Sequence, residues 1–301
     1  MELWIVITIA AAFLQNLRSA AQKHLKGVMG TTGATFVRFG FGMPFAFLFL
    51  AVLVWGRGVT LPALNGEFAL WVIAGASAQI GATFLLIHLF SFRNFAAGTA
   101  YSRTEPAQAA LFALIFLGET VTPGAIAAIA ISVLGVMLIS VAHSALTLKS
   151  LVTSVFQRNA LIGLASGLLF GISAVAYRAA SLSLGGPDFM TQAAVTLVCT
   201  ITLQTLAMGG WLLWKDRSEV ARIAKAWKIS LFTGATGASA SFGWFMAMTL
   251  QQAAVVKALA QIEMLFTFAA TVFFFREKIT AREAWGCLLI VAGILVLLRL
   301  G

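Results

Sequence analysis

The chain has 301 residues, of which 60% are hydrophobic and only 10% are charged. A soluble domain carries about 25% charged residues, so this composition excludes an ordinary soluble protein and is typical of a membrane protein. The net charge of +10 would suggest nucleic acid in a soluble chain, but here the basic residues cluster in short loops between apolar runs. A topology signal at an anionic membrane surface explains that pattern better, so no nucleic-acid partner is expected.

Apolar runs of about 20 residues, the length that crosses a bilayer as a helix, recur along the whole chain. Such runs leave the α-helix as the way to satisfy the backbone in lipid, and no alternating ten-residue pattern indicates a barrel. The first run is expected to be a permanent helix, because Met1 and Glu2 offer no basic segment of a cleavable signal. The sequence therefore predicts an all-α integral membrane protein with ten transmembrane helices, near residues 3–21, 33–55, 68–90, 96–116, 124–142, 160–182, 189–213, 229–250, 254–275 and 283–299.

Two stretches repeat each other at an offset of 158 residues without a gap, residues 96–140 and residues 254–298. Both place one carboxylate deep in an apolar run and a second at the short break before the next run. The matched pairs are Ala100 and Ala258, Glu105 and Glu263, Glu119 and Glu277, Thr122 and Thr280, Val133 and Val291, and Gly135 and Gly293. A chain that repeats so costly a feature is expected to consist of two copies of one unit.

The repeat extends upstream, where nearby offsets match Arg18 with Arg178 and Thr35 with Thr191. The unit is therefore five helices, and because five is odd, the second copy must be inverted in the membrane relative to the first. The expected domains are a first five-helix repeat at 1–142, a linker at 143–159 and a second five-helix repeat at 160–301. Inverted repeats are the arrangement with which many secondary transporters alternate access between two sides.

Two segments lie outside the apolar runs. Residues 143–158 look like a short amphipathic segment, and residues 215–228 alternate basic and apolar residues at helical spacing. The second segment is either a helix in the membrane interface or, as we favour, a solvated helix without a binding role.

The distribution of Lys and Arg predicts the orientation. Thirteen of them follow the first, third, fifth, seventh and ninth helices, whereas the other face, with both termini, holds only Arg57 and Arg299. The positive-inside rule then places the odd-numbered loops in the cytoplasm and both termini outside. The expected location is the cell membrane, as a multi-pass protein of a bacterial inner membrane.

Seven charged residues lie inside the predicted helices, away from the loops and the chain termini, and five of them are basic. A charge near the bilayer centre costs at least about 2.5–3.5 kcal/mol, so such groups must pair, face the bundle interior or line a wet cavity. If each acid neutralises one cation, up to three positive charges remain for water, backbone carbonyls or an anionic substrate, and Arg18 and Arg38 could reduce this surplus by reaching an interface. The residues are Arg18, Arg38, Arg103, Arg178 and Lys257, with Glu105 and Glu263.

The run at 96–116 has the densest polar set. Tyr101 and Glu105 share one helix face, and Pro106 removes a backbone N–H and frees the carbonyl of Ser102, which predicts a kink beside a carboxylate. In the run at 254–275, Lys257 and Gln261 have the same spacing as Tyr101 and Glu105. Aromatic residues Trp244 and Tyr177, with His88, complete a set that resembles a small-molecule site.

A purely structural interpretation stays open. Glu105 and Glu263 could lock the bundle as partners of Arg178 and Arg18, although intramembrane ionisable residues are functional by default. His88 is favoured as a packing histidine. Glu119 and Glu277 are expected to cap the helices that follow them.

Catalytic, metal and cofactor sites are not expected. Cys199 and Cys287 lie in apolar runs without metal-ligand spacing, and the glycine-rich runs at 75–84 and 234–243 lack the Lys-Ser/Thr pair of a phosphate loop. They are interpreted as close-packing helix surfaces.

The two copies resemble the EamA domain of the drug/metabolite transporter superfamily. The resemblance covers nearly the whole chain and is strongest around Pro106, Gly118-Glu119 and Gly135, and then Glu277 and Gly293. It implies export or uptake of a small metabolite by alternating access without ATP. The second copy departs from the first in having Met264 where the first has Pro106. Members of this superfamily are usually drawn with both termini in the cytoplasm, opposite to the orientation that the charges of this chain predict.

We therefore predict a secondary transporter, most plausibly an exporter of an amino-acid-like or other anionic or zwitterionic solute, with protons as the candidate coupling ion. The alternatives are a channel or a lipid scramblase and, less favoured, a membrane-embedded enzyme; monomer and homodimer stay open. A central cavity is expected between the halves, lined by the first, third, fourth, sixth, eighth and ninth helices. The expected substrate-binding or coupling residues are Glu105, Glu263, Arg103, Arg178, Lys257, Arg18, Tyr101, Gln261, Tyr177, Trp244 and His88.

Overall fold

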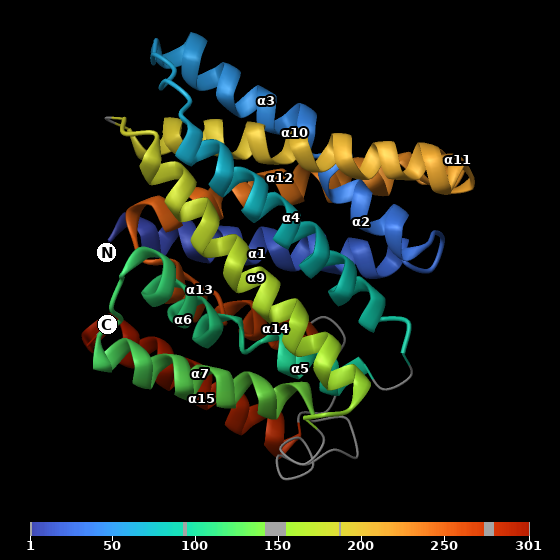
Figure 1. Cartoon of the computed structure of the whole chain (residues 1–301). Helices are drawn as coiled ribbons and strands as arrows, with labels where there is room; N and C mark the ends of the chain where they lie inside the picture. Colours follow the sequence, from blue (N-terminus) through green and yellow to red (C-terminus); the bar gives the residue numbers. More distant parts are fainter. Residues whose placement is uncertain (1, 93–94, 142–154, 187, 274–279, 301) are drawn as a thin grey trace.

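The computed structural model of the chain describes residues 2–92, 95–141, 155–186, 188–273 and 280–300, and within these ranges it holds helices and turns without a strand (Figure 1). In chain order the helices are α1 (Leu3–Leu25), α2 (Thr31–Gly40), α3 (Met43–Ala51) with the π-helix η1 (Val52–Gly56), α4 (Gly66–Leu89), α5 (Phe95–Ser102), α6 (Glu105–Leu117), α7 (Pro123–Ser140), α9 (Arg158–Ser183), α10 (Phe189–Lys215), α11 (Arg217–Lys225), α12 (Trp227–Leu250), α13 (Ala253–Leu259), α14 (Ile262–Phe273) and α15 (Ala281–Leu300).

Within the described residues, seven helical segments are long and apolar enough to cross a membrane: α1, the segment from α2 to η1, α4, α7, α9, α10 and α15. Helix α12 has 24 residues, but its run of Gly, Ser and Thr lowers its mean hydropathy. The predicted helices at 96–116 and 254–275 are each divided, into α5 and α6 and into α13 and α14. The chain is therefore an all-helical, multi-pass membrane protein in which two expected helices are broken.

Both breaks are short turns at equivalent places of the repeat. Between α5 and α6 the amide of Thr104 donates to the Tyr101 carbonyl, and between α13 and α14 the amide of Gln261 donates to the Ala258 carbonyl. The first break is the kink that Pro106 predicted. The second forms with Met264 in the position of the proline, so a missing N–H is not what breaks the helix there.

The helix pairs show the internal symmetry of the fold. Helix α4 packs along α9 as α1 packs along α12, α7 lies beside α15, and α2 lies beside α10 (Figure 1). Close contact of α7 and α15 depends on small residues, since a Cβ at Gly135 would lie 2.7 Å from the Gly286 carbonyl oxygen. These two helices form an outer pair, which leaves the broken helices on the inside, next to α1 and α9.

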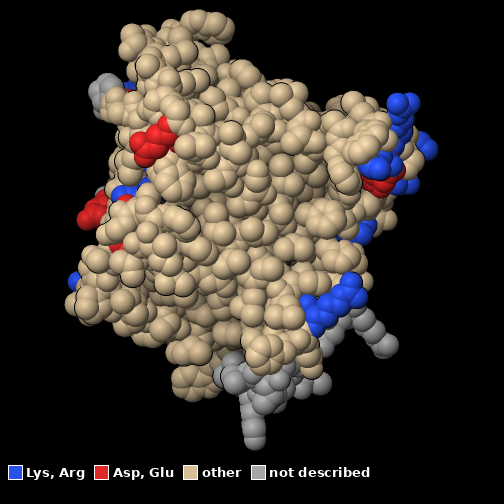
Figure 2. Space-filling model, in the orientation of Figure 1, with Lys and Arg blue, Asp and Glu red and all other residues tan. Residues whose placement is uncertain are grey.

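Both ends of the described chain lie on one side of the molecule, and α11 lies on the opposite side (Figure 1). In the space-filling view most of the visible surface between these sides carries no charge, and Lys and Arg gather at the end that carries α11 (Figure 2). An uncharged belt between two polar ends is the surface expected of a protein in a bilayer.

Helix α11 packs against the rest of the fold through its acidic residue. Glu219 is 1% exposed, and its carboxylate accepts from the backbone N–H of Gly30 at 2.9 Å and pairs with Arg222. Gly30 is the N-cap residue of α2, so a carboxylate from the second half supplies the N-terminal charge that favours this helix. Helix α11 in the segment at 215–228 is thus docked through Glu219 and Ile223, while its other residues are exposed, as the favoured prediction of a solvated helix has it. The expected amphipathic segment at 143–158 and the expected cap by Glu277 lie largely or wholly outside the described residues.

Candidate functional site

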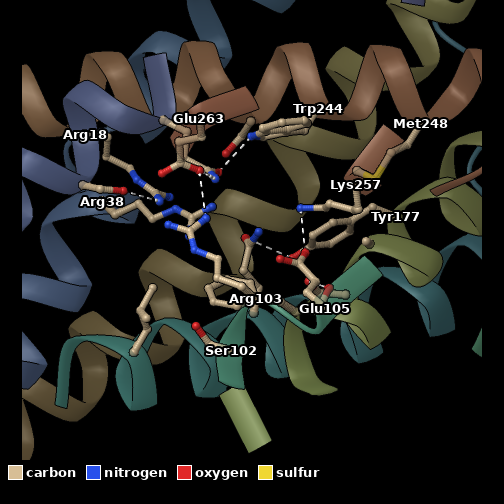
Figure 3. A pocket seen from close by; sticks show the side chains of 18 of the residues that line it. Arg18, Arg38, Ser102, Arg103, Glu105, Tyr177, Trp244, Met248, Lys257 and Glu263 are labelled. Carbon is tan, nitrogen blue, oxygen red and sulfur yellow. Dashed lines mark hydrogen bonds and ion pairs between the residues drawn. The ribbon is translucent and has the colours of Figure 1, made fainter. Parts of the chain in front are cut away.

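A cavity of about 120 Å³ lies between the two halves of the chain (Figure 3). Its lining comes from α1, α4, α5, α6, α9, α12, α13 and α14, the helices that the sequence analysis expected, and from Arg38 of α2 in addition. The two breaks lie at its wall, because Ser102, Arg103 and Glu105 line it from the first break and Glu263 from the second. Broken helices place backbone and ionisable groups together at membrane depth, an arrangement that also occurs in the solute-binding sites of many transporters.

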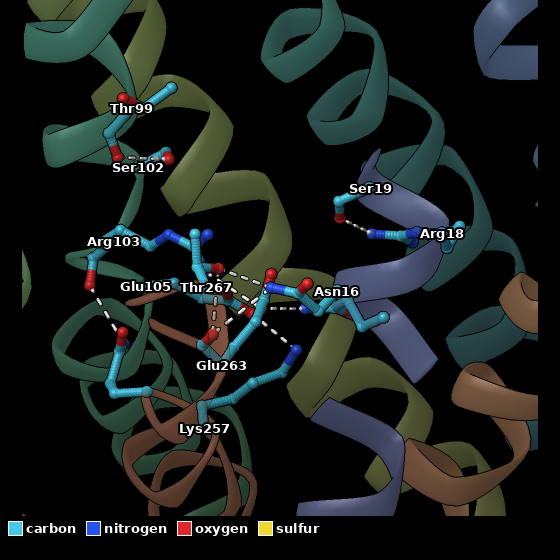
Figure 4. A network of polar contacts seen from close by, with 12 residues as sticks. Asn16, Arg18, Ser19, Thr99, Ser102, Arg103, Glu105, Lys257, Glu263 and Thr267 are labelled. Carbon is cyan, nitrogen blue, oxygen red and sulfur yellow. Dashed lines mark hydrogen bonds and ion pairs between the residues drawn. The ribbon is translucent and has the colours of Figure 1, made fainter. Parts of the chain in front are cut away.

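Glu263 is held in a polar network that joins four elements (Figure 4). Arg103 Nη1 lies 3.2 Å from Glu263 Oε2, and Gln15 Nε2 donates to the same oxygen at 2.9 Å. The Trp244 indole donates to Gln15 Oε1 at 3.0 Å. The Glu263 side chain is 4% exposed, so this carboxylate is desolvated and depends on its partners for compensation.

The second carboxylate of the cavity pairs with a lysine. Lys257 Nζ lies 2.8 Å from Glu105 Oε1, with 13% and 19% of the two side chains exposed. The same ammonium lies 4.9 Å from the ring centroid of Trp244, at cation–π distance. In both ion pairs one residue comes from the first repeat and one from the second.

Two arginines of the cavity have no carboxylate partner among the described residues. Arg18 is 5% and Arg38 is 4% exposed. Arg38 Nη1 donates to Thr83 Oγ1 at 3.0 Å, Arg18 Nη2 donates to Ser19 Oγ at 3.3 Å, and Arg18 Nε has no partner. The expectation that these arginines reach a membrane interface is wrong, because both are buried and line the cavity.

Arg178 does not line the cavity and forms its contacts outside it. Its Nε donates to Glu119 Oε1 at 2.7 Å, and its Nη1 donates to the carbonyls of Met248 at 2.6 Å and Gln251 at 2.9 Å. The pairings of Glu105 with Arg178 and of Glu263 with Arg18 are thus not formed. Glu119 also does not cap α7; Thr122 does, by accepting from the next turn. Arg178 lies towards the end of α9, beside the turn that carries Glu119, and away from the cavity lining.

Tyr177 forms part of the cavity wall through a buried hydrogen-bond cluster. Its hydroxyl donates to the Gly75 carbonyl at 2.9 Å and lies 3.1 Å from Gln79 Oε1, and Gln204 Nε2 donates to the same hydroxyl at 3.2 Å. A Cβ at Gly75 would lie 2.5 Å from the tyrosine ring, so this approach requires glycine. The cluster joins α4, α9 and α10 behind the site.

Of the eleven residues that the sequence predicted, the cavity lining contains Glu105, Glu263, Arg103, Lys257, Arg18, Tyr177 and Trp244. Tyr101 is buried against Val141 and Ala160, and Gln261 donates to the Arg103 carbonyl at 3.4 Å behind the lining. His88 lies on the outer face, with ring centroids 6.2 Å from Phe84 and 5.1 Å from Phe92.

Sequence reasoning missed several polar lining residues, among them Gln15, Arg38, Gln79 and Ser173. The sequence contained an indication for the two glutamines and for the arginine. Gln15 and Gln79 are amides inside apolar runs, which need a buried partner, and Arg38 belonged to the five membrane-embedded cations. For Ser173 the sequence contained no such indication. A serine in a membrane helix can donate to a backbone carbonyl of the same helix, as Ser173 does to the Phe170 carbonyl.

The cavity differs in exposure between its two ends. At one end Leu86, Phe90 and Phe170 are half-buried, and at the other Trp244 and Met248 are only 4% and 2% exposed. The half-buried end lies where α4 ends, on the side of the molecule that carries α11 (Figure 1). Beyond the buried end lies the contact of Arg178 with Glu119. The lining is therefore more exposed at the end on the α11 side than at the end towards the termini.

The described residues hold no group of three His, Cys, Asp or Glu side chains that could bind a metal ion. What the geometry offers instead is a small compartment with four cations and two carboxylates, hence two positive charges in excess. Such a compartment is suited to bind a small negatively charged molecule.

One solved crystal structure is similar over 97% of this chain and 95% of that chain, with a TM-score of 0.69 and 18% sequence identity, which shows a shared fold. Comparison with curated protein sequences gives no match. The family model of the EamA-like transporters matches twice, at residues 2–141 and at residues 157–299. The two matches correspond to the two repeats and together cover nearly the whole chain, so this protein belongs to the EamA-like transporter family.

Proposed function

We propose that this protein is a secondary transporter that exports a small anionic or zwitterionic metabolite across a cell membrane by alternating access. The observation that carries the proposal is the closed-ended, positively charged cavity at the junction of two repeats. In this proposal α12 and the broken pairs α5–α6 and α13–α14 also cross the membrane, which with the seven long segments makes ten spans in two inverted sets of five.

Two features support export as the direction of transport: the distribution of Lys and Arg, and the side of the molecule on which the cavity is more exposed. Most Lys and Arg of the loops lie on the α11 side, and the positive-inside rule assigns that side to the cytoplasm. The more exposed end of the cavity lies on the same side, which supports a conformation that would load solute from the cytoplasm. The contact of Arg178 with Glu119 and with two carbonyls of the α12–α13 region would hold the opposite side closed.

Glu105 and Glu263 are the proposed switches. Each neutralises a cation from the other repeat, so protonation of either would free Lys257 or Arg103 to bind solute and would loosen the contact between repeats. Solute binding and proton binding would then compete for the same charges, which is a physical basis for coupled transport.

The size of the cavity supports a carrier of small solutes over a channel or a lipid scramblase. A volume of about 120 Å³ has room for roughly ten water molecules, which is less than a lipid needs. A closed end also gives no continuous pore. A membrane-embedded enzyme would need a nucleophile hydrogen-bonded to a base, whereas Ser102 and Ser173 of the lining donate to backbone carbonyls.

The purified protein should be reconstituted in liposomes preloaded with unlabelled alanine, succinate or phosphate, and entry of the same labelled solute measured. A carrier is expected to show saturable exchange with at least one of them and to lose it in Glu105→Gln. Glu67→Gln, a matched change at an exposed carboxylate of α4, should leave exchange intact. Flux that does not saturate would point to a channel, and unchanged flux and pH dependence in Glu105→Gln would remove the switch role.

A further inference from the structure

We infer that the transported solute is a small dianion whose negative charge binds between Arg18 and Arg38; this rests on the proposed function and names its substrate class. The inference comes from how the charges of the cavity are partnered. Of its four cations, Arg103 and Lys257 each have a carboxylate within 3.2 Å and 2.8 Å. The other two have neutral partners.

Arg18 and Arg38 reach the cavity from α1 and α2 and extend towards the same space (Figure 3). Their aliphatic stems pass over Gly237 of α12, where a Cβ would lie 3.3 Å from Arg18 Cδ and 3.4 Å from Arg38 Cγ. They are 5% and 4% exposed, and their hydrogen-bond partners are hydroxyls. Arg38 also lies 5.3 Å from the ring centroid of Phe39. Two buried like charges whose partners are all neutral need a counter-charge, because desolvation of each costs several kcal/mol.

The internal repeat supplies a comparison within the same molecule. In the sequence repeat, an offset of 160 residues matches Arg18 of the first half with Arg178 of the second. Arg178 is saturated by Glu119 and two backbone carbonyls, whereas Arg18 Nε has no partner. Of the two arginines matched in the sequence repeat, one thus forms a structural contact outside the cavity lining, and the other lines the cavity and is available to a ligand.

The carboxylates argue against a cationic or zwitterionic solute. Glu263 already accepts from Arg103 and Gln15, and Glu105 pairs with Lys257. An ammonium group would have to compete with these partners, whereas an anion would meet two guanidinium groups, the side chains best suited to carboxylate and phosphate oxygens. The two positive charges in excess match a charge of −2.

The rest of the lining limits the organic part of the solute. Trp244, Phe245 and Met248 form an apolar wall at the closed end. With about 120 Å³ available, this end accepts a short carbon chain and no more. The shared chemistry is therefore a small doubly negative solute, either a short dicarboxylate or a phosphate compound.

Binding should be measured on the full purified chain in detergent at pH 8, as the shift of the thermal unfolding midpoint with sodium succinate, sodium phosphate, alanine or sodium chloride at matched ionic strength. A saturable rise with succinate alone identifies a dicarboxylate, and a rise with phosphate alone identifies a phosphate compound. A rise with both identifies the dianion charge itself. A rise with alanine only, or with none of the solutes beyond chloride, overturns the inference.

Variants test the location. Arg38→Gln and Arg18→Gln are expected to weaken binding of the active dianion at least about tenfold, without lowering the midpoint of the ligand-free protein. Arg57→Gln removes the same charge from an exposed site and should leave binding unchanged. Ser19→Asp, which puts a carboxylate beside Arg18, should also abolish the ligand effect. Full binding by Arg38→Gln places the site elsewhere.

The experiments distinguish failure of the transporter proposal from failure of the dianion site. If succinate or phosphate binds but no solute exchanges across liposomes, the anion site stands and the carrier does not. If alanine exchanges saturably and this exchange survives Arg38→Gln, the carrier stands and the dianion site does not.

Discussion

The ion pairs of the cavity link residues that are far apart in the sequence. Arg103 with Glu263 and Glu105 with Lys257 each join the first repeat to the second. A buried pair contributes little net stability, but removal of one partner leaves an uncompensated charge and costs up to about 3–5 kcal/mol. The pairs therefore act as contacts that break only together with a change in protonation, solute or conformation.

A double-mutant cycle tests whether Glu105 and Lys257 compensate each other's charge. Glu105→Gln should lower the thermal unfolding midpoint by several degrees, because Lys257 keeps its charge beside Trp244 without a carboxylate. Lys257→Gln combined with Glu105→Gln should recover most of that loss. The measurement is thermal unfolding of the four proteins in one detergent. If the double variant loses the sum of the two single losses, the two residues are not coupled.

At the scale of elements, α9 carries a stripe of glycines that lets the broken helix approach. Gly163, Gly167 and Gly171 are four residues apart and so share one face. A Cβ at Gly163 would overlap the Gly98 carbonyl of α5, and Cβ atoms at Gly167 and Gly171 would lie 2.9 Å from the Ser102 carbonyl and 3.1 Å from the Ala109 amide of α6. The stripe thus spans the break on both sides and positions Arg103 and Glu105.

Gly163→Ala should therefore destabilise the protein by about 1–3 kcal/mol or more, since backbone must move to admit the methyl group. The matched control is Gly210→Ala on α10, where no atom lies within 4 Å of the added Cβ. In that position alanine should be neutral or stabilise by up to about 1 kcal/mol, because glycine is the weaker helix former. Thermal unfolding of both variants measures the difference. Equal unfolding midpoints would show that stability does not depend on the close approach of α5 to α9 at Gly163.

At the scale of the whole molecule the repeats are equivalent in topology but not in contacts. On the side of the termini, Arg178 joins α9 to the turn between α6 and α7 and to the end of α12. Among the described residues, Arg18, which the sequence repeat matches with Arg178, forms no such contacts. In the proposed transporter this difference would keep one end of the cavity closed, and exchange of the two arrangements is what alternating access requires.

A cysteine in the cavity can report that exchange. With Cys199 and Cys287 replaced by serine, Ser173→Cys should react with a membrane-impermeant thiol reagent from the α11 side only. Adding Glu119→Gln removes the carboxylate partner of Arg178 and should increase reaction from the side of the termini, because the closed arrangement loses its charge-assisted hydrogen bond. Reaction rates that are the same with and without Glu119→Gln would mean that this contact does not control access.

Much of the fold could be predicted from the sequence, because hydrophobic length and periodicity determine which segments enter a bilayer. The repeat was visible in matched residues, and the kink at Pro106 followed from the chemistry of proline. The break before Met264 was not predictable, since no residue there lacks an N–H; only its packing at the cavity accounts for its position. Of the site, the embedded charges were found, whereas Gln15 and Ser173 depended on neighbours that sequence alone does not reveal.

By itself, the sequence determined that this is a helical membrane protein of two repeats with a surplus of buried positive charge, since composition and spacing suffice for those conclusions. Only the tertiary structure decided which charges neutralise each other. It paired Arg178 with Glu119 and left Arg18 and Arg38 facing the cavity without a carboxylate. The physical reason is that an ion pair acts over a few ångströms, and which side chains come that close is determined by the packing of helices from different repeats.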